Sequence, residues 1–286
     1  MNSLRDQAMP YSEAPIFIGG LFKSGTTLLR AMLGQHSSIA SGLETQWFNM
    51  DWDGMKDKAF YDHIERLRNF YGFKKDVTER IVVESKDVIQ FLNLFLGLFT
   101  KSLGKKRWAE KTPGNILHLD RIYAGWPGAK VIHIIRDPRD VFASLRQAKK
   151  WDSIEVFSDL WCQYLGSAER FKKETPYHED QFMEIRYEAL ITRPKEVMKR
   201  LLIFLGEIWE DQVAVFQGNK DDYHKVLEIT GTASTTLIRL GEPLTKTRVG
   251  IWRDAVREDE IRQIHDLVDQ KGLFNLMESI ENESII

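Results

Sequence analysis

Residues 15–29 read PIFIGGLFKSGTTLL, and this stretch decides the fold. Its first five residues are a short apolar run that ends in glycine, which predicts a buried strand. Residues 26–35 carry apolar side chains on one side of a helical pattern and predict a helix. A glycine-rich loop between a strand and a helix points backbone N–H groups, and the positive end of the helix dipole, at an anion. The stretch therefore predicts a phosphate-binding loop, with an ordinary glycine-rich turn as the alternative.

The loop differs from the triphosphate-binding loop G-x-x-x-x-G-K-[ST], in which lysine follows the second glycine directly. Gly20 and Gly25 have the required spacing, but Thr26 stands at the lysine position. The lysine of the loop, Lys23, comes three positions earlier. An early cation followed by two threonines suits a phosphosulfate better than a magnesium-bound triphosphate. No cluster of metal ligands is recognised in the sequence, so no metal is expected.

The rest of the chain alternates predicted strands with predicted helices. Strands are expected at 130–135 and 181–185, and Pro138 is expected to open a helix at its first position. Further helices are expected at residues 55–71, 78–103, 153–173, 193–205 and, as the last helix, 257–270. This alternation predicts an α/β fold with a parallel β-sheet flanked by helices on both faces.

A single domain over residues 1–286, with its core at 15–272, is expected because no composition shift marks a boundary. Residues 218–247 have weak periodicity and mixed charge, and we expect a mobile loop there that contacts acceptor and nucleotide. The net charge of -2 provides no global field for nucleic acid, so no such partner is expected.

Composition also bears on location. Residues 1–14 have no apolar signal-peptide core, and the most apolar run, 88–99, is too short to span a membrane. The single cysteine, Cys162, cannot form an internal disulfide. We therefore expect a cytoplasmic protein without a membrane span, either a monomer or a homodimer.

A second motif at residues 131–144 reads VIHIIRDPRDVFAS and again runs from strand to helix. Arg136 leaves the strand at its carboxyl end, where open α/β sheets bind ligands. Ser144 lies in the second turn of the helix that follows. An arginine fork beside a hydroxyl suits a phosphate monoester. Arg139 is interpreted as one half of a structural ion pair.

These two motifs, in this order, resemble those of the sulfotransferases that use 3′-phosphoadenosine 5′-phosphosulfate (PAPS). The resemblance covers residues 15–272 and is closest in style to the tyrosylprotein, heparan-type and bacterial members. It implies a P-loop NTPase-like sulfotransferase fold and PAPS as co-substrate. By this likeness Lys23 contacts the transferring sulfonate. The remaining implied contacts are Ser24, Gly25, Thr26 and Thr27 for the 5′-phosphate, and Arg136 and Ser144 for the 3′-phosphate.

Two later stretches fit the same family. Residues 186–190 resemble the segment that places Tyr187 near the adenine, although a core position is equally consistent. Residues 248–253, RVGIWR, resemble the glycine-tryptophan loop that closes over the nucleotide. Arg248 is then a third cation for the 3′-phosphate, Gly250 is part of the loop, and Trp252 packs on the base or on the core.

Sulfonate transfer needs a base for the acceptor proton and cations for the sulfonyl and leaving oxygens. The resemblance assigns the base to Glu44, with a structural salt bridge as the alternative, and makes Lys111 a helper of Lys23. We expect the loss of either lysine to slow transfer without changing the pH dependence of the base.

Cytosolic small-molecule members of the family have a catalytic histidine two residues after the lysine that Lys111 matches. Pro113 occupies that position here, which strengthens the assignment of Glu44. His36 and His118 are the possible substitutes.

The sequence thus predicts an enzyme that moves a sulfonate group from PAPS to a hydroxyl or amine. The acceptor is expected to be a small molecule, a carbohydrate or a lipid-like compound. The alternatives are a P-loop nucleotide kinase, or a non-catalytic nucleotide-binding protein of the same fold.

Overall fold

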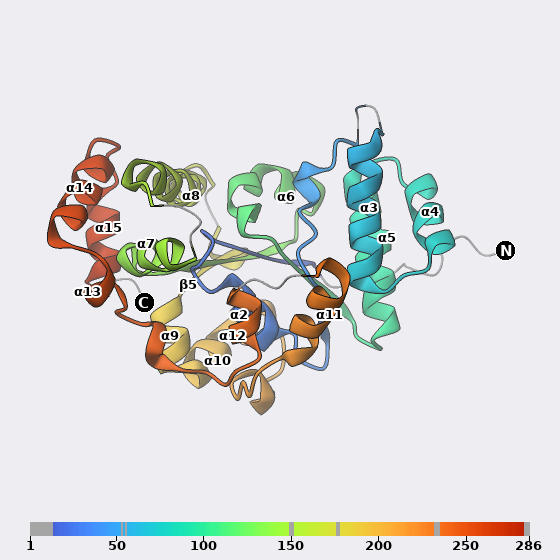
Figure 1. Cartoon of the computed structure of the whole chain (residues 1–286). Helices are drawn as coiled ribbons and strands as arrows, with labels where there is room; N and C mark the ends of the chain where they lie inside the picture. Colours follow the sequence, from blue (N-terminus) through green and yellow to red (C-terminus); the bar gives the residue numbers. More distant parts are fainter. Residues whose placement is uncertain are drawn as a thin grey trace.

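A five-stranded parallel sheet forms the centre of the computed structural model, which describes residues 14–52, 54, 56–148, 152–175, 178–231 and 235–282 (Figure 1). The spatial order of the strands is β2-β3-β1-β4-β5, and every pair is parallel. The strands are β1 (Ile16–Gly19), β2 (Ile39–Ser41), β3 (Arg107–Lys111), β4 (Lys130–Ile135) and β5 (Phe182–Arg186). The predicted α/β class is confirmed. The expectation about a leader at residues 1–14 falls, except for Ala14, outside the described residues.

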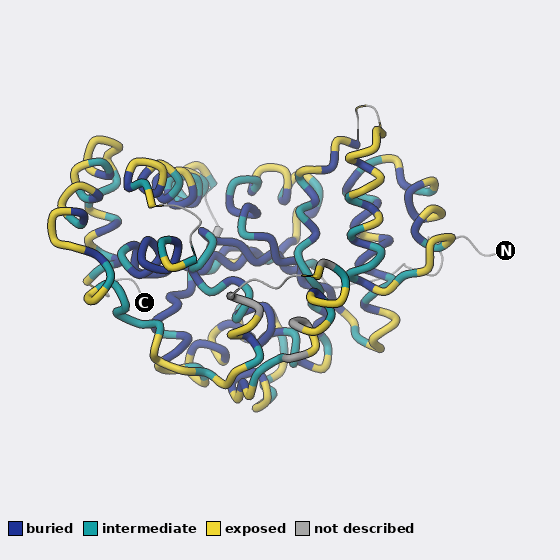
Figure 2. The backbone as a smooth tube through the Cα atoms, viewed as in Figure 1, coloured by how far each residue is buried: buried dark blue, intermediate teal, exposed yellow. Residues whose placement is uncertain are grey.

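Alternating side chains of the strands build a core on each face of the sheet, as the period of two requires. Ile16 and Ile18 of β1 join one core, and Phe17 joins the other. The first face is covered by α2 (Thr26–Leu33), α9 (Tyr187–Thr192) and α10 (Pro194–Leu205). The opposite face is covered by α5 (Val88–Ser102), α6 (Leu119–Gly125) and α8 (Ile154–Glu174). Figure 2 shows the strands buried, with exposed residues on the outer sides of the helices.

Two further groups of helices extend the domain at opposite ends of the sheet (Figure 1). Beside α5 lie α3 (Lys58–Tyr71) and α4 (Lys75–Glu84). Beside α8 lie α7 (Pro138–Gln147), α13 (Trp252–Ala255), α14 (Glu258–Asp269) and α15 (Phe274–Glu281). None of the helices in the described ranges has the length and hydropathy of a membrane span.

Two helix predictions need correction. The single helix expected at 78–103 is two helices, because the side chain of Asp87 accepts a hydrogen bond from the backbone of Gln90 and starts α5 anew. The helix expected to be the last, at 257–270, is followed by α15. Short β2 and β3 were not predicted at all.

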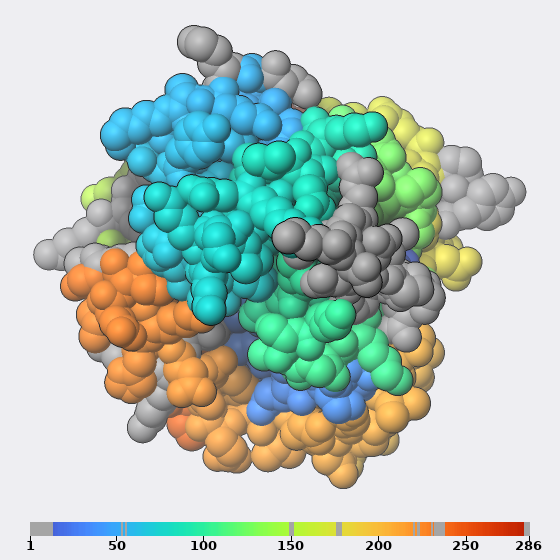
Figure 3. All heavy atoms as spheres, turned by 90° about the vertical axis from the view of Figure 1, so that its right-hand side faces the viewer, coloured from blue at the N-terminus to red at the C-terminus, as the bar shows by residue number. Residues whose placement is uncertain are grey.

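The loop expected at 218–247 is also wrong as secondary structure, since it contains α11 (Lys220–Thr230) and α12 (Thr235–Leu240). We call these two helices the flap. Its ends meet at a narrow neck, where the N–H of Asn219 donates to the carbonyl of Leu240 at 2.7 Å. Gly218 has φ 100 there, and an added Cβ would lie 2.5 Å from the carbonyl oxygen of Gly241. The flap contacts α3 and α2, and Figure 3 shows its orange residues beside the blue and cyan helices of that end.

Candidate active site

The predicted functional residues gather along the carboxyl edge of the sheet, around a cavity of about 820 Å³. Their order across that edge follows the order of the strands. Glu44 follows β2, Lys111 ends β3, Lys23 follows β1, Arg136 follows β4 and Tyr187 follows β5. The chain reverses its direction of winding at β1, which lies between β3 and β4. Ligands of open α/β sheets bind at such a switch point.

The phosphate loop is shaped for close approach of an anion. Gly25 precedes α2 with φ 100, and no side chain caps the helix, so the first amides of α2 are open to a ligand. A Cβ on Gly20 would lie 2.3 Å from the carbonyl oxygen of Ile134, and one on Gly25 would lie 2.4 Å from a ring carbon of Tyr187. Lys23 has φ 71, a conformation that costs a non-glycine residue roughly 1–3 kcal/mol.

Arg136 supports this strained loop through a hydrogen bond to its backbone. It is 5% exposed, and its guanidinium donates to the carbonyl of Lys23 at 2.7 Å and to Oγ of Ser144 at 3.3 Å. The guanidinium also lies 4.5 Å from the ring centroid of Tyr187. Its buried Nε has no hydrogen-bond partner. A buried polar atom without a partner is costly, so the group is suited to receive a ligand atom.

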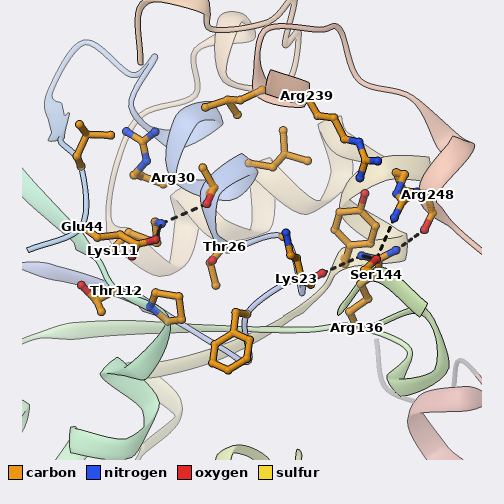
Figure 4. Close-up of a pocket in the computed structure, with 18 of the residues that line it drawn as sticks. Lys23, Thr26, Arg30, Glu44, Lys111, Thr112, Arg136, Ser144, Arg239 and Arg248 are labelled. Carbon is orange, nitrogen blue, oxygen red and sulfur yellow. Dashed lines mark hydrogen bonds and ion pairs between the residues drawn. The ribbon is translucent and has the colours of Figure 1, made fainter. Parts of the chain in front are cut away.

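Arg248 reaches the same place from the other side of the cavity. It donates to Oγ of Ser144 at 3.0 Å and to the side chain of Gln147 at 3.0 Å. Its pKa is lowered by partial burial and by the charges of Arg239 and Arg136. We call Arg136, Ser144 and Arg248 the arginine cluster (Figure 4). Positive charges that repel one another in one place favour the binding of an anion.

Glu44 and Lys111 form an ion pair at the opposite end of the cavity (Figure 4). Lys111 also donates to Oγ1 of Thr27 at 3.2 Å, which links the carboxylate to the phosphate loop. Burial by itself raises the pKa of Glu44. The charge and hydrogen bond of Lys111, with the charges of Arg30 and Arg66, outweigh burial and lower the pKa of Glu44 below its ordinary value.

This pairing bears on one expectation from the sequence. Lys111 is 2% exposed, and burial lowers its pKa while the charge of Glu44 raises it. Since each charge influences the protonation of the other, the structure leads us to predict that loss of Lys111 changes the pH dependence of Glu44, where the sequence led us to expect no change.

The backbone around Glu44 is held by side chains from α3 and α2. Arg66 donates to the carbonyls of Glu44 and Thr45 at 3.1 and 2.9 Å. Arg30 donates to the carbonyl of Gly42 at 3.1 Å. Because these donors are fixed on helices, the carboxylate is held against the end of β3.

A buried carboxyl beneath the site completes this support. Glu110 is 1% exposed and accepts hydrogen bonds from Thr45, Thr112 and Asn115. Burial raises the pKa of Glu110. Glu110 and Lys111 are neighbours on β3, so their side chains point to opposite faces of the sheet. Glu110 thus holds the segments around Thr45 and Thr112, and Lys111 faces the cavity.

Ten of the predicted site residues line one cavity: Lys23, Gly25, Thr26, Thr27, Glu44, Lys111, Arg136, Ser144, Tyr187 and Arg248. Ser24, Gly250 and Trp252 lie outside its lining. The backbone N–H groups of Gly250 and Trp252 donate to Asp140 at 2.8 and 3.0 Å. The ring of Trp252 lies 4.1 Å from the guanidinium of Arg139 and packs on the core. These residues hold the segment that carries Arg248.

The remaining candidates have structural surroundings. Arg139 pairs with Asp137 at 2.9 Å, as predicted. His36 is fully buried, with Nε2 2.9 Å from the carbonyl oxygen of Ile208. His118 stacks on Phe48 with ring centroids 4.3 Å apart. Neither histidine lines the cavity, so neither is placed to replace Glu44 as the base.

The lining residues that the sequence did not predict include Arg30, Arg66, Tyr164 and Arg239. Tyr164 belongs to α8, and burial together with the charge of Glu44 raises its pKa to about 12. Arg30 is a buried charge on an otherwise apolar helix, which is a signal that the sequence offered. The others carry no local signal, because they reach the site from distant helices.

Comparisons with known proteins give the family and the fold. The family model described as "Sulfotransferase family" matches residues 15–211. A protein-tyrosine sulfotransferase of Drosophila melanogaster is 24% identical over 88% of this chain and 49% of its own length. The fold is similar to a sulfotransferase domain of the curacin biosynthetic pathway, with TM-score 0.66, 17% identity and coverage of 90% and 98% of the two chains.

A mouse sulfotransferase solved in complex with PAP has TM-score 0.50 and 16% identity, and the match covers 93% of this chain and 88% of that one. The chain spans about half the length, or less, of several curated relatives that it matches.

Proposed function

The chain belongs to the sulfotransferase family, and we propose that it transfers a sulfonate group from PAPS to a hydroxyl or amine of an acceptor. The observation that carries the proposal is the order of groups along the sheet edge. The paired carboxylate Glu44 lies at one end, the phosphate loop lies in the middle, and the arginine cluster lies at the other end. A donor with two separated phosphates would fit with one phosphate at the phosphate loop and the other at the arginine cluster. Its sulfonate would then lie beside Glu44.

The donor contacts follow from the two anion sites. The amides at the start of α2, with the hydroxyls of Thr26 and Thr27, would hold the 5′-phosphate. The arginine cluster would hold the 3′-phosphate, and the unpartnered Nε of Arg136 supports that fit. Tyr187, beside Arg136 and Gly25, would lie near the adenine. PAPS supplies an activated sulfonate whose leaving group is a phosphate. A PAP complex is known for the mouse neighbour.

The residues at the Glu44 end would perform the proton transfer. The acceptor oxygen or nitrogen forms a bond to sulfur, its proton passes to the Glu44 carboxylate, and the bond from sulfur to the phosphate oxygen breaks. 3′,5′-Adenosine bisphosphate (PAP) leaves. Lys111 and Lys23 would stabilise the negative charge on the sulfonyl and leaving oxygens. The contact of Lys111 with both Glu44 and Thr27 supports this role, since it spans base and loop.

The walls near Glu44 support a small-molecule acceptor with an apolar or aromatic body. Leu43 precedes the base, and Phe70 lies one turn beyond Arg66 on α3. Other apolar or aromatic residues that line the cavity include Phe22, Phe48, Leu117 and Tyr164. Ligand sites of this kind are mostly apolar with a few placed polar groups.

The two alternatives fit less well. A nucleotide kinase would need a lysine after Gly25, where Thr26 begins α2. A non-catalytic binding protein would not need a buried lysine held between a carboxylate and the phosphate loop. Location in the cytoplasm, oligomeric state and independence from metals stay predictions of the sequence.

The test is transfer from radiolabelled PAPS to a panel of phenols, aliphatic alcohols, sugars and amines, with and without EDTA. We expect product with at least one class, no product when ATP replaces PAPS, and the same rate in EDTA. PAP and AMP binding is measured alongside by calorimetry. Absence of product together with equal affinity for PAP and AMP would refute the proposal.

A further inference from the structure

A third arginine points into the phosphate end of the cavity from the flap. Arg239 belongs to α12 and lines the same cavity as the arginine cluster. Figure 4 shows its guanidinium directed toward Arg248 and Ser144, from the side opposite Arg136. The residues of the cluster come from the end of β4, from α7 and from the segment before α13, whereas Arg239 comes from the flap.

The charges around this point are only partly balanced by carboxylates. Asp140 forms an ion pair with Arg136 at 3.6 Å, and its oxygens also accept from the backbones of Gly250 and Trp252. Asp140 lies outside the cavity lining, whereas Glu242 belongs to it. Within the described ranges, neither Arg239 nor Arg248 forms an ion pair with a carboxylate.

The position of Arg239 is fixed by its neighbour in the sequence. Leu240 is 3% exposed and packs in the core with Phe216. Its carbonyl accepts the hydrogen bond from Asn219 that closes the neck. Because the backbone next to Arg239 is anchored, its exposed side chain starts from a fixed place at the rim of the cavity, beside the arginine cluster.

We propose that Arg239 is a further specificity-determining residue that binds the 3′-phosphate of the donor together with the arginine cluster. The inference rests on the proposed function, because it assumes a donor with a 3′-phosphate. The phosphate is then held from two sides, by the sheet edge and by the flap. Three arginines around one dianion give the donor site its preference for a nucleotide with a 3′-phosphate over one without it.

The experiment compares Arg239→Gln with the parent protein for binding of PAP and of AMP by isothermal titration calorimetry at low salt. PAP and AMP differ by the 3′-phosphate alone. We expect the parent to bind PAP more tightly than AMP. In the variant, the ratio of the PAP affinity to the AMP affinity should be about tenfold smaller, the usual effect of losing one charge-assisted contact. The affinity for AMP should stay within twofold. Arg239→Lys, which keeps the charge, should recover part of the ratio.

Lys246→Gln is the matched control, since Lys246 is an exposed cation of the same region that does not line the cavity. It should keep the ratio of the parent. An unchanged ratio in Arg239→Gln, or an equal loss of PAP and AMP affinity, would overturn the inference and leave the proposed function intact. A parent that binds PAP and AMP equally would overturn both.

Discussion

Replacing Glu44 by glutamine tests the centre of the proposed chemistry. The amide keeps the shape of the side chain but cannot take up the acceptor proton. We expect the saturated rate of transfer to fall by about 10²–10⁴-fold, the usual contribution of a positioned general base. Binding of PAP should change little, because the start of α2 and the arginine cluster belong to segments of the sheet edge other than the one that carries Glu44.

The structure also sets the expected cost in stability. Lys111, at 2% exposure, would lose a charged partner, which is strongly destabilising when nothing replaces it. The amide oxygen of glutamine can still accept the hydrogen bond, and Glu44 is 34% exposed, so solvent screens part of the lost charge. The free energy of unfolding should therefore fall by only about 1 kcal/mol. Urea unfolding checks this figure before any rate is interpreted.

The assay is single-turnover transfer at saturating PAPS, with an acceptor found in the panel, over a range of pH. Glu242→Gln is the control, because it removes another carboxylate of the same cavity, one carried by the segment after the flap. Its rate should stay within threefold of the parent. If Glu44→Gln also stays within threefold at every pH, Glu44 is not the base and the reasoning is refuted.

Three further outcomes are expected. Arg136→Ala should weaken PAP binding tenfold to hundredfold, by loss of charge-assisted contacts, and change the saturated rate less; a normal affinity with a collapsed rate would contradict the assignment. Lys111→Met should raise the pKa of Glu44, because burial then outweighs the remaining charges. The transfer rate of the variant should therefore start to fall at a higher pH than that of the parent when the solution is acidified. An acidic limb of the pH–rate profile that does not move would count against the ion pair. Gly25→Ala should cost more stability in urea than Gly72→Ala, because both have positive φ (100 and 72) but only Gly25 has an aromatic ring where the Cβ would lie; equal costs of roughly 1–2 kcal/mol would remove the steric reason for this glycine.

The parts of the site that the sequence predicted are those with a local pattern. The phosphate loop and the segment around Arg136 each join a short apolar strand to a helix that starts at a threonine or a proline, and both were predicted in place. Such signals need no knowledge of distant residues. The positions of Lys23, Arg136 and Ser144 at the sheet edge follow from them directly.

Strand β3 shows why other parts could not be predicted. It reads RWAEK, with no alternation of apolar and polar residues, yet all five residues are buried. Arg107 donates to the carbonyl of Leu205, Glu110 binds Thr45, and Lys111 pairs with Glu44. These partners lie 65 to 98 residues away in the chain. The charges are tolerated in the core because of contacts that no window of sequence contains.

The secondary structure of the flap was predicted wrongly for a related reason. Its helices carry little apolar periodicity of their own, and they are held by packing against α2 and α3 and by the bond between Asn219 and Leu240. Tertiary contact overrides weak local propensity in such a segment. Arg239 was therefore read as part of a loop, and its place over the arginine cluster was not foreseen.

The chain leaves and re-enters the rest of the structure at one point, the neck, where Asn219 bonds to Leu240. The segment from Asn219 to Leu240 can therefore be regarded as a cassette, meaning an insertion whose two ends lie side by side. A cassette with joined ends can change in length and sequence at little entropic cost to the scaffold that carries it. Val226 on one of its helices lines the cavity, so an exchange of the cassette would reshape part of the cavity wall. Arg239, one residue before the end of the cassette, would be exchanged with it. If Arg239 binds the donor as proposed, a graft that changes this wall must keep an arginine at that position to preserve the affinity for the donor.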